Sequence, residues 1–257
     1  MSNIHSTAIV SKKAELGKDV SIGPHSIIEE NVIIGDGCKI ESSVVIASGA
    51  RLGKNVSVSH SAVIATEPQD LKFGGEETLA EIGDNTVVRE FVTINRGTIA
   101  HGKTTLGKNC LVMAYAHVAH DCIIGDGVIM ANSVNLAGHV EIGDFAILGG
   151  VLPVHQFVKI GAHSMIGGGF RVQQDICPYS LVGGYPLKVV GINSVGLKRR
   201  GFTQDTVRTL EQVFKILFFS NLNTTQAAEK IQIEFDSTAE IKEILGFINR
   251  SNRGIVK

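Results

Sequence analysis

The sequence contains no tryptophan, and aromatic residues make up only 5% of its 257 residues. With so few rings, the core must be filled mainly by aliphatic side chains. The formal net charge of -1 excludes the strongly basic field with which proteins hold nucleic acid. No stretch approaches the roughly 20 consecutive apolar residues of a membrane span, and no basic, apolar leader segment is evident. We therefore expect a cytoplasmic protein with no integral membrane segment and no nucleic-acid partner.

Cysteine is scarce as well. Cys38, Cys110, Cys122 and Cys177 lie far apart in the sequence, and none belongs to a CxxC pair. This spacing argues against both a disulfide framework and a zinc knuckle. We expect all four cysteines to be reduced and structural.

What the chain does contain is glycine, with 29 residues, and a repeat of six residues. From Ile4 to Val172 an aliphatic residue returns at every sixth position. Of the 29 positions in this frame, 26 are Ile, Leu, Val or Met, and the exceptions are Asp70, Glu76 and Ala100. A small or β-branched residue lies four positions after most of them, so two residues of every six point inward. Such a period is typical of the hexapeptide β-helix.

Three hexapeptides make one triangular coil of 18 residues, so residues 18 apart are expected to stack at about 4.8 Å. Gly, Asp and Asn often follow the aliphatic residue, and these types tolerate the left-handed backbone of a corner. The frame lapses between Ala65 and Glu81 and between Asn95 and Thr105, which predicts two loops. A long loop on a stiff solenoid is usually functional or disordered, and we favour a function for the first.

Helical periodicity replaces the hexapeptide frame after Pro186. Three apolar stripes predict three helices, and Ser237-Thr-Ala-Glu240 fits a capping box at the start of the last one. We predict a β-helix over residues 1–190 and a helical domain over residues 191–257, which can cover the open end of the solenoid. The stripes are Val207, Leu210, Phe214 and Leu217; Ala228, Ile231 and Phe235; and Ile241, Ile244, Leu245 and Ile248.

Histidines gather near the middle of the repeat, and His is the side chain poised to accept a proton near neutral pH. His117 and His120 lie close together, and Asp121 follows directly. A single corner histidine is usually just solvated, but four histidines within two or three coils beside an acid favour a function. The 18-residue stacking predicts two further pairs on the following coils of the same edge: Gly138 with His139, then His155 with Gln156.

A metal site is the sharpest alternative, since His is the commonest zinc ligand. His117 and His120 are three residues apart on a strand and a corner, and side chains placed in this way do not obviously converge. We therefore predict no metal and no other cofactor.

Seven strings of the chain closely resemble the UDP-N-acetylglucosamine acyltransferase family, which begins lipid A biosynthesis in Gram-negative bacteria. The resemblance runs nearly from end to end and implies a left-handed parallel β-helix that assembles as a homotrimer. The strings are Pro68-Gln-Asp-Leu-Lys72, Thr93-Ile-Asn-Arg-Gly97, Ala116-His-Val-Ala-His-Asp121, Leu136-Ala-Gly-His139, Val154-His-Gln-Phe157, Asp175-Ile-Cys-Pro-Tyr179 and Gly196-Leu-Lys-Arg-Arg-Gly-Phe202.

The family moves an (R)-3-hydroxyacyl chain from acyl carrier protein to the 3-hydroxyl of UDP-N-acetylglucosamine. By resemblance, His120 is the general base, Asp121 orients it, and the Gly138 N–H stabilises the oxyanion. Gly168 matches the position that sets acyl length. The other residues that the resemblance places at the substrates are Asp70, Lys72, His117, His139, His155, Gln156 and Asn193, with Arg199 and Arg200 in a basic patch for phosphates and for the acidic carrier.

Two other functions stay open at this stage. One is a sister acyltransferase that uses coenzyme A or a later lipid A intermediate, and some relatives also accept an amino sugar. The other is a non-catalytic β-solenoid, which predicts featureless corners and no long loops. The histidine cluster and the loop from Pro68 to Gly75 speak against this second alternative.

Overall fold

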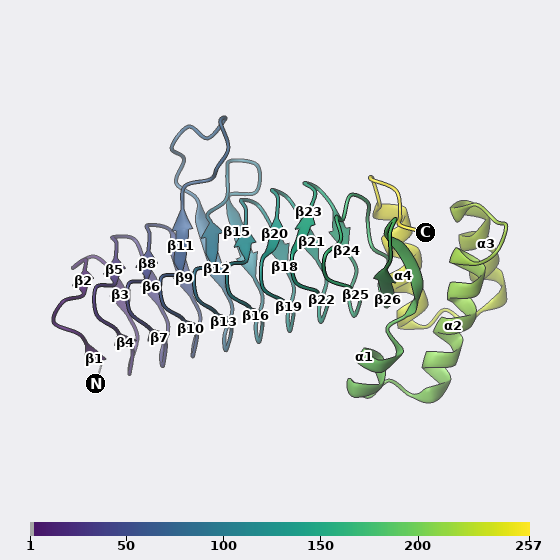
Figure 1. Cartoon of the computed structure of the whole chain (residues 1–257), viewed down its shortest axis with the longest axis horizontal. Coiled ribbons are helices and arrows are strands. Elements are labelled where there is room, and N and C mark those ends of the chain that lie inside the picture. Colours follow the sequence, from purple (N-terminus) through teal and green to yellow (C-terminus); the bar gives the residue numbers. More distant parts are fainter. Residues whose placement is uncertain (1–2) are drawn as a thin grey trace.

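The structure is a computed structural model that describes residues 3–257. They form a long triangular prism of short strands with helices at its C-terminal end (Figure 1). The strands make three sheets, named here faces A, B and C, and neighbouring strands are parallel throughout except for the last pair of face A.

Face A has eleven strands: β1 (Asn3–Ile4), β4 (Ser21–Ile22), β7 (Lys39–Ile40), β10 (Ser57–Val58), β13 (Val87–Val88), β16 (Leu111–Val112), β19 (Ile129–Met130), β22 (Ile147–Leu148), β25 (Met165–Ile166), β26 (Ser180–Gly183) and β27 (Lys188–Ile192). Face B has eight: β2 (Ile9–Val10), β5 (Ile27–Ile28), β8 (Val45–Ile46), β11 (Val63–Thr66), β14 (Thr93–Asn95), β17 (His117–Val118), β20 (Val134–Leu136) and β23 (Leu152–Val154). Face C also has eight: β3 (Glu15–Leu16), β6 (Ile33–Ile34), β9 (Ala50–Leu52), β12 (Leu79–Ile82), β15 (Lys103–Leu106), β18 (Ile123–Ile124), β21 (Glu141–Ile142) and β24 (Lys159–Ile160).

The register between coils follows the predicted 18 residues. Lys39 pairs with Ser57, and His117 pairs with Asn135. The two predicted loops change the offset, since Ser57 pairs with Val87 and Val87 with Leu111. Each insertion is therefore a whole number of hexapeptides, and the aliphatic frame continues unbroken on the far side.

Aliphatic ladders fill the prism, as the repeat predicts. Each fully buried Ile, Leu or Val side chain stabilises the fold by roughly 1.5–3 kcal/mol. The stiffness of the solenoid follows from this continuous packing of one coil on the next. Beyond its exposed first rung, Ile4, the ladder behind face A is buried: Ile22, Ile40, Val58, Val88, Val112, Met130, Leu148 and Ile166.

The corners accept larger residues than Gly, Asp and Asn. The third residue after most aliphatic positions takes a left-handed conformation, and at several corners this residue is aromatic or His, including Phe91 (φ 58°) and His139 (φ 62°). Their rings stack between coils: Phe91 on Tyr115 with centroids 5.1 Å apart, and His139 on Phe157 at 4.5 Å. Stacking of this kind offsets the backbone strain of about 1–3 kcal/mol.

Four helices follow the prism: α1 (Ser194–Arg199), α2 (Gln204–Phe218), α3 (Thr224–Glu234) and α4 (Ala239–Arg250). The three predicted stripes correspond to α2, α3 and α4, whereas α1 is too short to show a periodic pattern. No helix in the described chain has the length and apolar character to cross a bilayer. The predicted domain boundary after residue 190 lies inside β27 and stays a prediction.

The predicted capping box at Ser237 is wrong by one residue. The cap of α4 is Thr238, whose hydroxyl accepts a hydrogen bond from the Ile241 N–H at 3.4 Å. Adjacent Ser and Thr are both good caps, so the sequence alone does not separate them. A complete capping box occurs instead at α3, between Asn223 and Gln226.

The C-terminal segment is fastened to the last coil through Asp175, which is fully buried. Its carboxylate accepts hydrogen bonds from the Lys159 N–H and from the Ser251 hydroxyl. Its backbone N–H donates to Gly254, and its carbonyl accepts from Val256. These bonds hold the helices across the open end of the solenoid, where an uncapped coil would expose its core.

We predict that stability falls at acidic pH, in part through His163. Its ring lies between Phe145 and Tyr179, and burial together with the charge of Arg200 lowers its pKa, while Asp144 raises it to a smaller extent. Since the unfolded histidine has the higher pKa, acid favours unfolding as pH falls below about 6.5. His163→Phe keeps the stack, and Phe fits this corner as Phe145 does at φ 60°. Thermal denaturation between pH 7.5 and pH 5.5 should show a smaller loss of stability in this variant than in the wild type, and an equal loss contradicts the assignment.

Candidate active site

Both loops project from the same edge of the prism, where the chain passes from face B to face C (Figure 1). Residues 67–78 connect β11 to β12, and residues 96–102 connect β14 to β15. His120 and Asp121 lie on the same edge, between β17 and β18. This site edge, as we name it, therefore combines the two predicted loops with the His120 and Asp121 side chains.

His120 and Asp121 form an acid–imidazole pair in which the acid is buried and the imidazole is partly exposed. The His120 Nδ1 lies 2.8 Å from Asp121 Oδ2, and Asp121 is fully buried. Burial alone raises the pKa of the Asp121 carboxyl, but hydrogen bonds from Thr98 and His120 outweigh it and hold the pKa below its usual range. The ionised carboxylate accepts a hydrogen bond from the protonated Nδ1 of His120, so that Nε2 is left with a free lone pair.

The predicted stacking of the next coil on this pair is confirmed. The His139 N–H donates to the His120 carbonyl at 3.1 Å. A Cβ atom placed on Gly138 would lie 2.7 Å from His120 Nε2, so the imidazole fills the space beside this glycine. Within residues 3–257 the Gly138 N–H has no hydrogen-bond partner, and it is free to donate to a ligand.

Two neighbouring imidazoles complete the cluster. The His139 ring packs edge-on against His120, with centroids 5.1 Å apart, and His117 Nδ1 lies 2.7 Å from the Thr93 hydroxyl. Burial lowers the pKa of His117 and also that of His139, although the charge of Asp121 opposes the shift at His139. At neutral pH both rings are therefore uncharged, and each can donate or accept one hydrogen bond.

The first loop carries Asp70 toward the cluster. The negative charge of Asp70 contributes to the pKa of His139, which places the two side chains in the same electrostatic neighbourhood. Asp70 also accepts a hydrogen bond from the Lys72 N–H at 3.0 Å, which shapes the turn. His155 and Gln156 lie on the same edge, one coil beyond Gly138, since the neighbouring Phe157 N–H donates to the Gly138 carbonyl.

The remaining predicted residues lie elsewhere in this chain. Gly168 is on the edge between faces A and B, where a Cβ would meet the Gly150 carbonyl at 2.8 Å. Asn193 caps α1, and its side chain donates to the His163 carbonyl at 2.9 Å. The Arg200 guanidinium lies over the Phe145 ring at 4.1 Å, and Arg199 ends α1. One chain by itself therefore does not bring these four residues to the site edge.

Three residues that the sequence did not single out as site residues contact Asp121 or anchor the first loop. Thr98 and His101, on the second loop, contact Asp121 directly. Arg96 anchors the first loop, with its guanidinium 5.4 Å from the Phe73 ring centroid and 3.5 Å from the Glu67 carboxylate. Arg96 belongs to the string Thr93-Ile-Asn-Arg-Gly97, which carries the family resemblance, whereas the sequence signal for Thr98 and His101 is that they occupy a lapse in the hexapeptide frame.

Three side chains could in principle hold a metal ion. The ligand atoms of His120, Asp121 and His139 lie within 4.8 Å of one another. This trio differs from the pair His117 and His120 that the sequence suggested. Each Asp121 oxygen already accepts two hydrogen bonds, so a metal would have to displace them. The chemistry of the donors favours a hydrogen-bonded acid–imidazole pair, and the absence of a metal stays a prediction.

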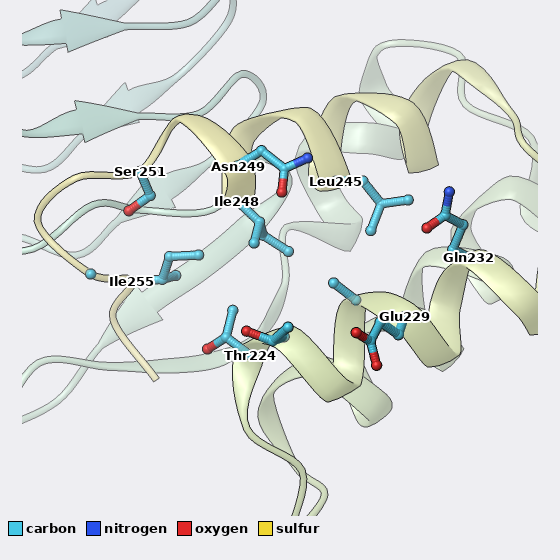
Figure 2. Close-up of a pocket in the computed structure, with 11 residues that line it drawn as sticks. Thr224, Glu229, Gln232, Leu245, Ile248, Asn249, Ser251 and Ile255 are labelled. Carbon is cyan, nitrogen blue, oxygen red and sulfur yellow. The ribbon is translucent and has the colours of Figure 1, made fainter.

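A separate cavity of about 460 Å³ lies between α3 and α4. Leu245 and Ile248 of α4 face Thr224 and Glu229 of α3 across it (Figure 2). None of the predicted site residues lines this cavity.

Comparison with known proteins agrees with the fold. A family model described as Udp N-acetylglucosamine O-acyltransferase, Domain 2, matches residues 175–256, and a model of six bacterial transferase hexapeptide repeats matches residues 13–48, 31–66 and 103–138. An acyl-[acyl-carrier-protein]--UDP-N-acetylglucosamine O-acyltransferase from Thermodesulfovibrio yellowstonii is 46% identical over 100% of both chains. One from Trichlorobacter lovleyi is 49% identical over 99% of both.

The crystal structure of a UDP-N-acetylglucosamine acyltransferase from Bacteroides fragilis 9343 superposes with a TM-score of 0.97 at 43% identity, over 98% of this chain and 99% of that one. The predicted fold class, a left-handed parallel β-helix with a C-terminal helical domain, is thereby confirmed. On its sequence over the full length and on its fold, the chain belongs to the UDP-N-acetylglucosamine O-acyltransferase family.

Proposed function

We propose that the protein transfers an (R)-3-hydroxyacyl chain from acyl carrier protein to the 3-hydroxyl of UDP-N-acetylglucosamine, the first step of lipid A biosynthesis. The observation that carries the proposal is the His120 imidazole, held by Asp121 at 2.8 Å and packed against the unpartnered amide of Gly138. A base and an oxyanion donor side by side are what acyl transfer to a hydroxyl requires. The names of the relatives supply the substrates.

In this mechanism His120 Nε2 takes the proton of the sugar 3-hydroxyl. At the same time the hydroxyl oxygen attacks the carbonyl carbon of the thioester. The Gly138 N–H donates to the oxyanion of the tetrahedral intermediate. The intermediate collapses when the carbon–sulfur bond breaks, and the imidazolium returns its proton to the departing thiolate. Asp121 keeps the imidazole in the reactive tautomer and stabilises its charged form, and no acyl-enzyme forms.

The residues around this centre are assigned to the substrates. Asp70 and Lys72 contact the sugar from the first loop, and His117, His139, His155 and Gln156 line the cleft along the site edge. By the same resemblance Gly168 sets the length of the acyl chain, and the Gly150 backbone fills the space that a Cβ on Gly168 would take. Asn193 belongs with the substrate-cleft residues. Arg199 and Arg200 serve the nucleotide phosphates and the acidic carrier, and an exposed guanidinium can grip a phosphate through two hydrogen bonds.

We further propose a homotrimer, because these last four residues lie away from the site edge of their own chain. Prisms packed side by side bring another edge of one chain to the site edge of its neighbour. Phe91 and Tyr115 are half exposed or more on the edge between faces A and B, which suits burial by a second chain. Sedimentation equilibrium should give three times the 27.4 kDa of one chain, and a stable monomer would contradict the assembly.

A cytoplasmic location is part of the same proposal. All four cysteines are buried and unpaired, as in proteins of a reducing compartment. Fractionation of cells that produce the protein should leave it in the cytoplasmic fraction rather than in the periplasm.

The reaction is tested by mass spectrometry of the products formed from UDP-N-acetylglucosamine and a mixture of (R)-3-hydroxyacyl carrier proteins. We expect one dominant O-acylated sugar nucleotide, whose mass also reports the chain length. The same acyl groups on coenzyme A should react at a far lower rate. No acylated product, or equal rates with both donors, would contradict the proposed donor and reaction.

A further inference from the structure

The loop of residues 96–102 surrounds the Asp121 carboxylate with hydrogen-bond donors. Thr98 contributes two of them, its N–H to Oδ1 at 2.9 Å and its hydroxyl to Oδ2 at 2.6 Å. The His101 N–H adds a weaker bond to Oδ1 at 3.3 Å. With His120 Nδ1 on Oδ2, each carboxylate oxygen has two partners. The loop that interrupts the hexapeptide frame at this point thus forms a carboxylate cradle, a set of hydrogen-bond donors around the Asp121 side chain.

The Thr98 hydroxyl is itself fixed in direction. It accepts a hydrogen bond from the Ala100 N–H at 3.2 Å, so its own proton points to Asp121. Thr98 is buried, with 7% of its surface exposed, and water does not compete readily for this bond. The hydroxyl therefore restrains the rotation of the carboxylate about its Cβ–Cγ bond.

We propose that Thr98 is a positioning residue for acyl transfer, which acts through Asp121 on the tautomer of His120. A carboxylate held in this plane presents Oδ2 to His120 Nδ1–H and keeps Nε2 unprotonated beside Gly138. The hydrogen bonds of Thr98 go to Asp121 and Ala100 and not to His120, and Thr98 is buried, so we assign it no contact with substrate. The inference rests on the proposed function in one respect, namely that His120 Nε2 is the base.

Thr98→Val tests the role of the hydroxyl, because valine keeps the shape and the backbone N–H. We expect kcat to fall about 10- to 100-fold, the effect of losing one hydrogen bond to a charged group, while KM for both substrates changes less than about twofold. Thr98→Ser restores the hydroxyl and should return kcat to within about threefold of the wild type. This pattern separates positioning from a loss of substrate affinity.

Thr86→Val is the matched control. Thr86 is buried like Thr98, and its hydroxyl donates to the Gly107 carbonyl at 2.8 Å and accepts from the Cys110 N–H at 3.1 Å. It lies on the edge between faces C and A, away from the site edge. Its replacement loses comparable hydrogen bonds and should leave kcat unchanged, so that a general loss of stability cannot explain the effect at Thr98.

The tautomer is read independently of activity by long-range ¹H–¹⁵N correlation spectra of the imidazole nitrogens. In the wild type at alkaline pH, His120 should be protonated on Nδ1, and Thr98→Val should raise the share of the Nε2-protonated form. This measurement stands even if the acyl-transfer reaction itself is not observed, so failure of the proposed function and failure of this inference are distinguishable. A folded Thr98→Val protein with wild-type kcat and a wild-type tautomer overturns the proposal.

Discussion

Replacing His120 by alanine is expected to lower kcat/KM for acyl transfer by about 100- to 10,000-fold, the usual contribution of a general base. The imidazole lies on the outside of the prism, and its side chain does not belong to the aliphatic core. The fold should therefore survive, with a circular dichroism spectrum and an oligomeric mass like those of the wild type. Turnover is measured with the acyl carrier protein donor under saturating UDP-N-acetylglucosamine.

His60→Ala provides a control that changes the same residue type at the same position of the hexapeptide. His60 follows Val58 by two residues, as His120 follows Val118, and it also faces a carboxylate, Glu41, at 3.1 Å. It lies on the edge between faces A and B, two coils before the cluster. We expect its activity to remain near that of the wild type. If His120→Ala retained near wild-type turnover while folded, another group would have to be the base.

The prism and half of the site follow from periodicity. A frame of six residues determines which side chains point inward, and three hexapeptides determine which residues stack. This arithmetic places Gly138 and His139 above His120 and Asp121, and the structure has them there. The prediction works because every coil between these residues has the same length.

The six-residue repeat does not determine which residues a loop places against the coils, so the loop contacts could not be predicted from the sequence. Thr98 and Asp121 are 23 residues apart, an interval that matches no number of whole coils, yet they form the shortest hydrogen bond of the site at 2.6 Å. Loop conformation depends on contacts such as the stacking of Arg96 on Phe73, and no repeat encodes these. The carboxylate cradle was therefore invisible before the structure.

Resemblance to a family assigns roles to positions but does not say what else a residue does. Asn193 is a predicted substrate residue, and in the structure it also caps α1 and holds the His163 carbonyl. Arg200 similarly packs on Phe145 as well as carrying charge. Substitution at either position would alter the docking of α1, and a loss of activity there would not by itself show contact with substrate.

Gly138→Ala should reduce kcat/KM by about 100-fold or more, since it disturbs both the base and the oxyanion donor. The new Cβ would lie 2.6 Å from His120 Cε1 and 2.7 Å from Nε2, which is closer than van der Waals contact allows. The imidazole cannot yield without losing the bond to Asp121 at 2.8 Å. Either the ring turns away from the reacting hydroxyl, or the amide at residue 138 moves away from the oxyanion position.

Gly191→Ala is the control for this change, because no atom lies within 4 Å of the position that its Cβ would take. Neither glycine has the positive φ that would strain an alanine, so the two variants differ only in what the methyl group meets. We expect Gly191→Ala to retain full activity, and both variants to unfold at similar temperatures. Wild-type kinetics in Gly138→Ala would mean that the His120 imidazole can shift without loss of activity. Acyl transfer would then not depend on the placement of this imidazole beside the Gly138 amide.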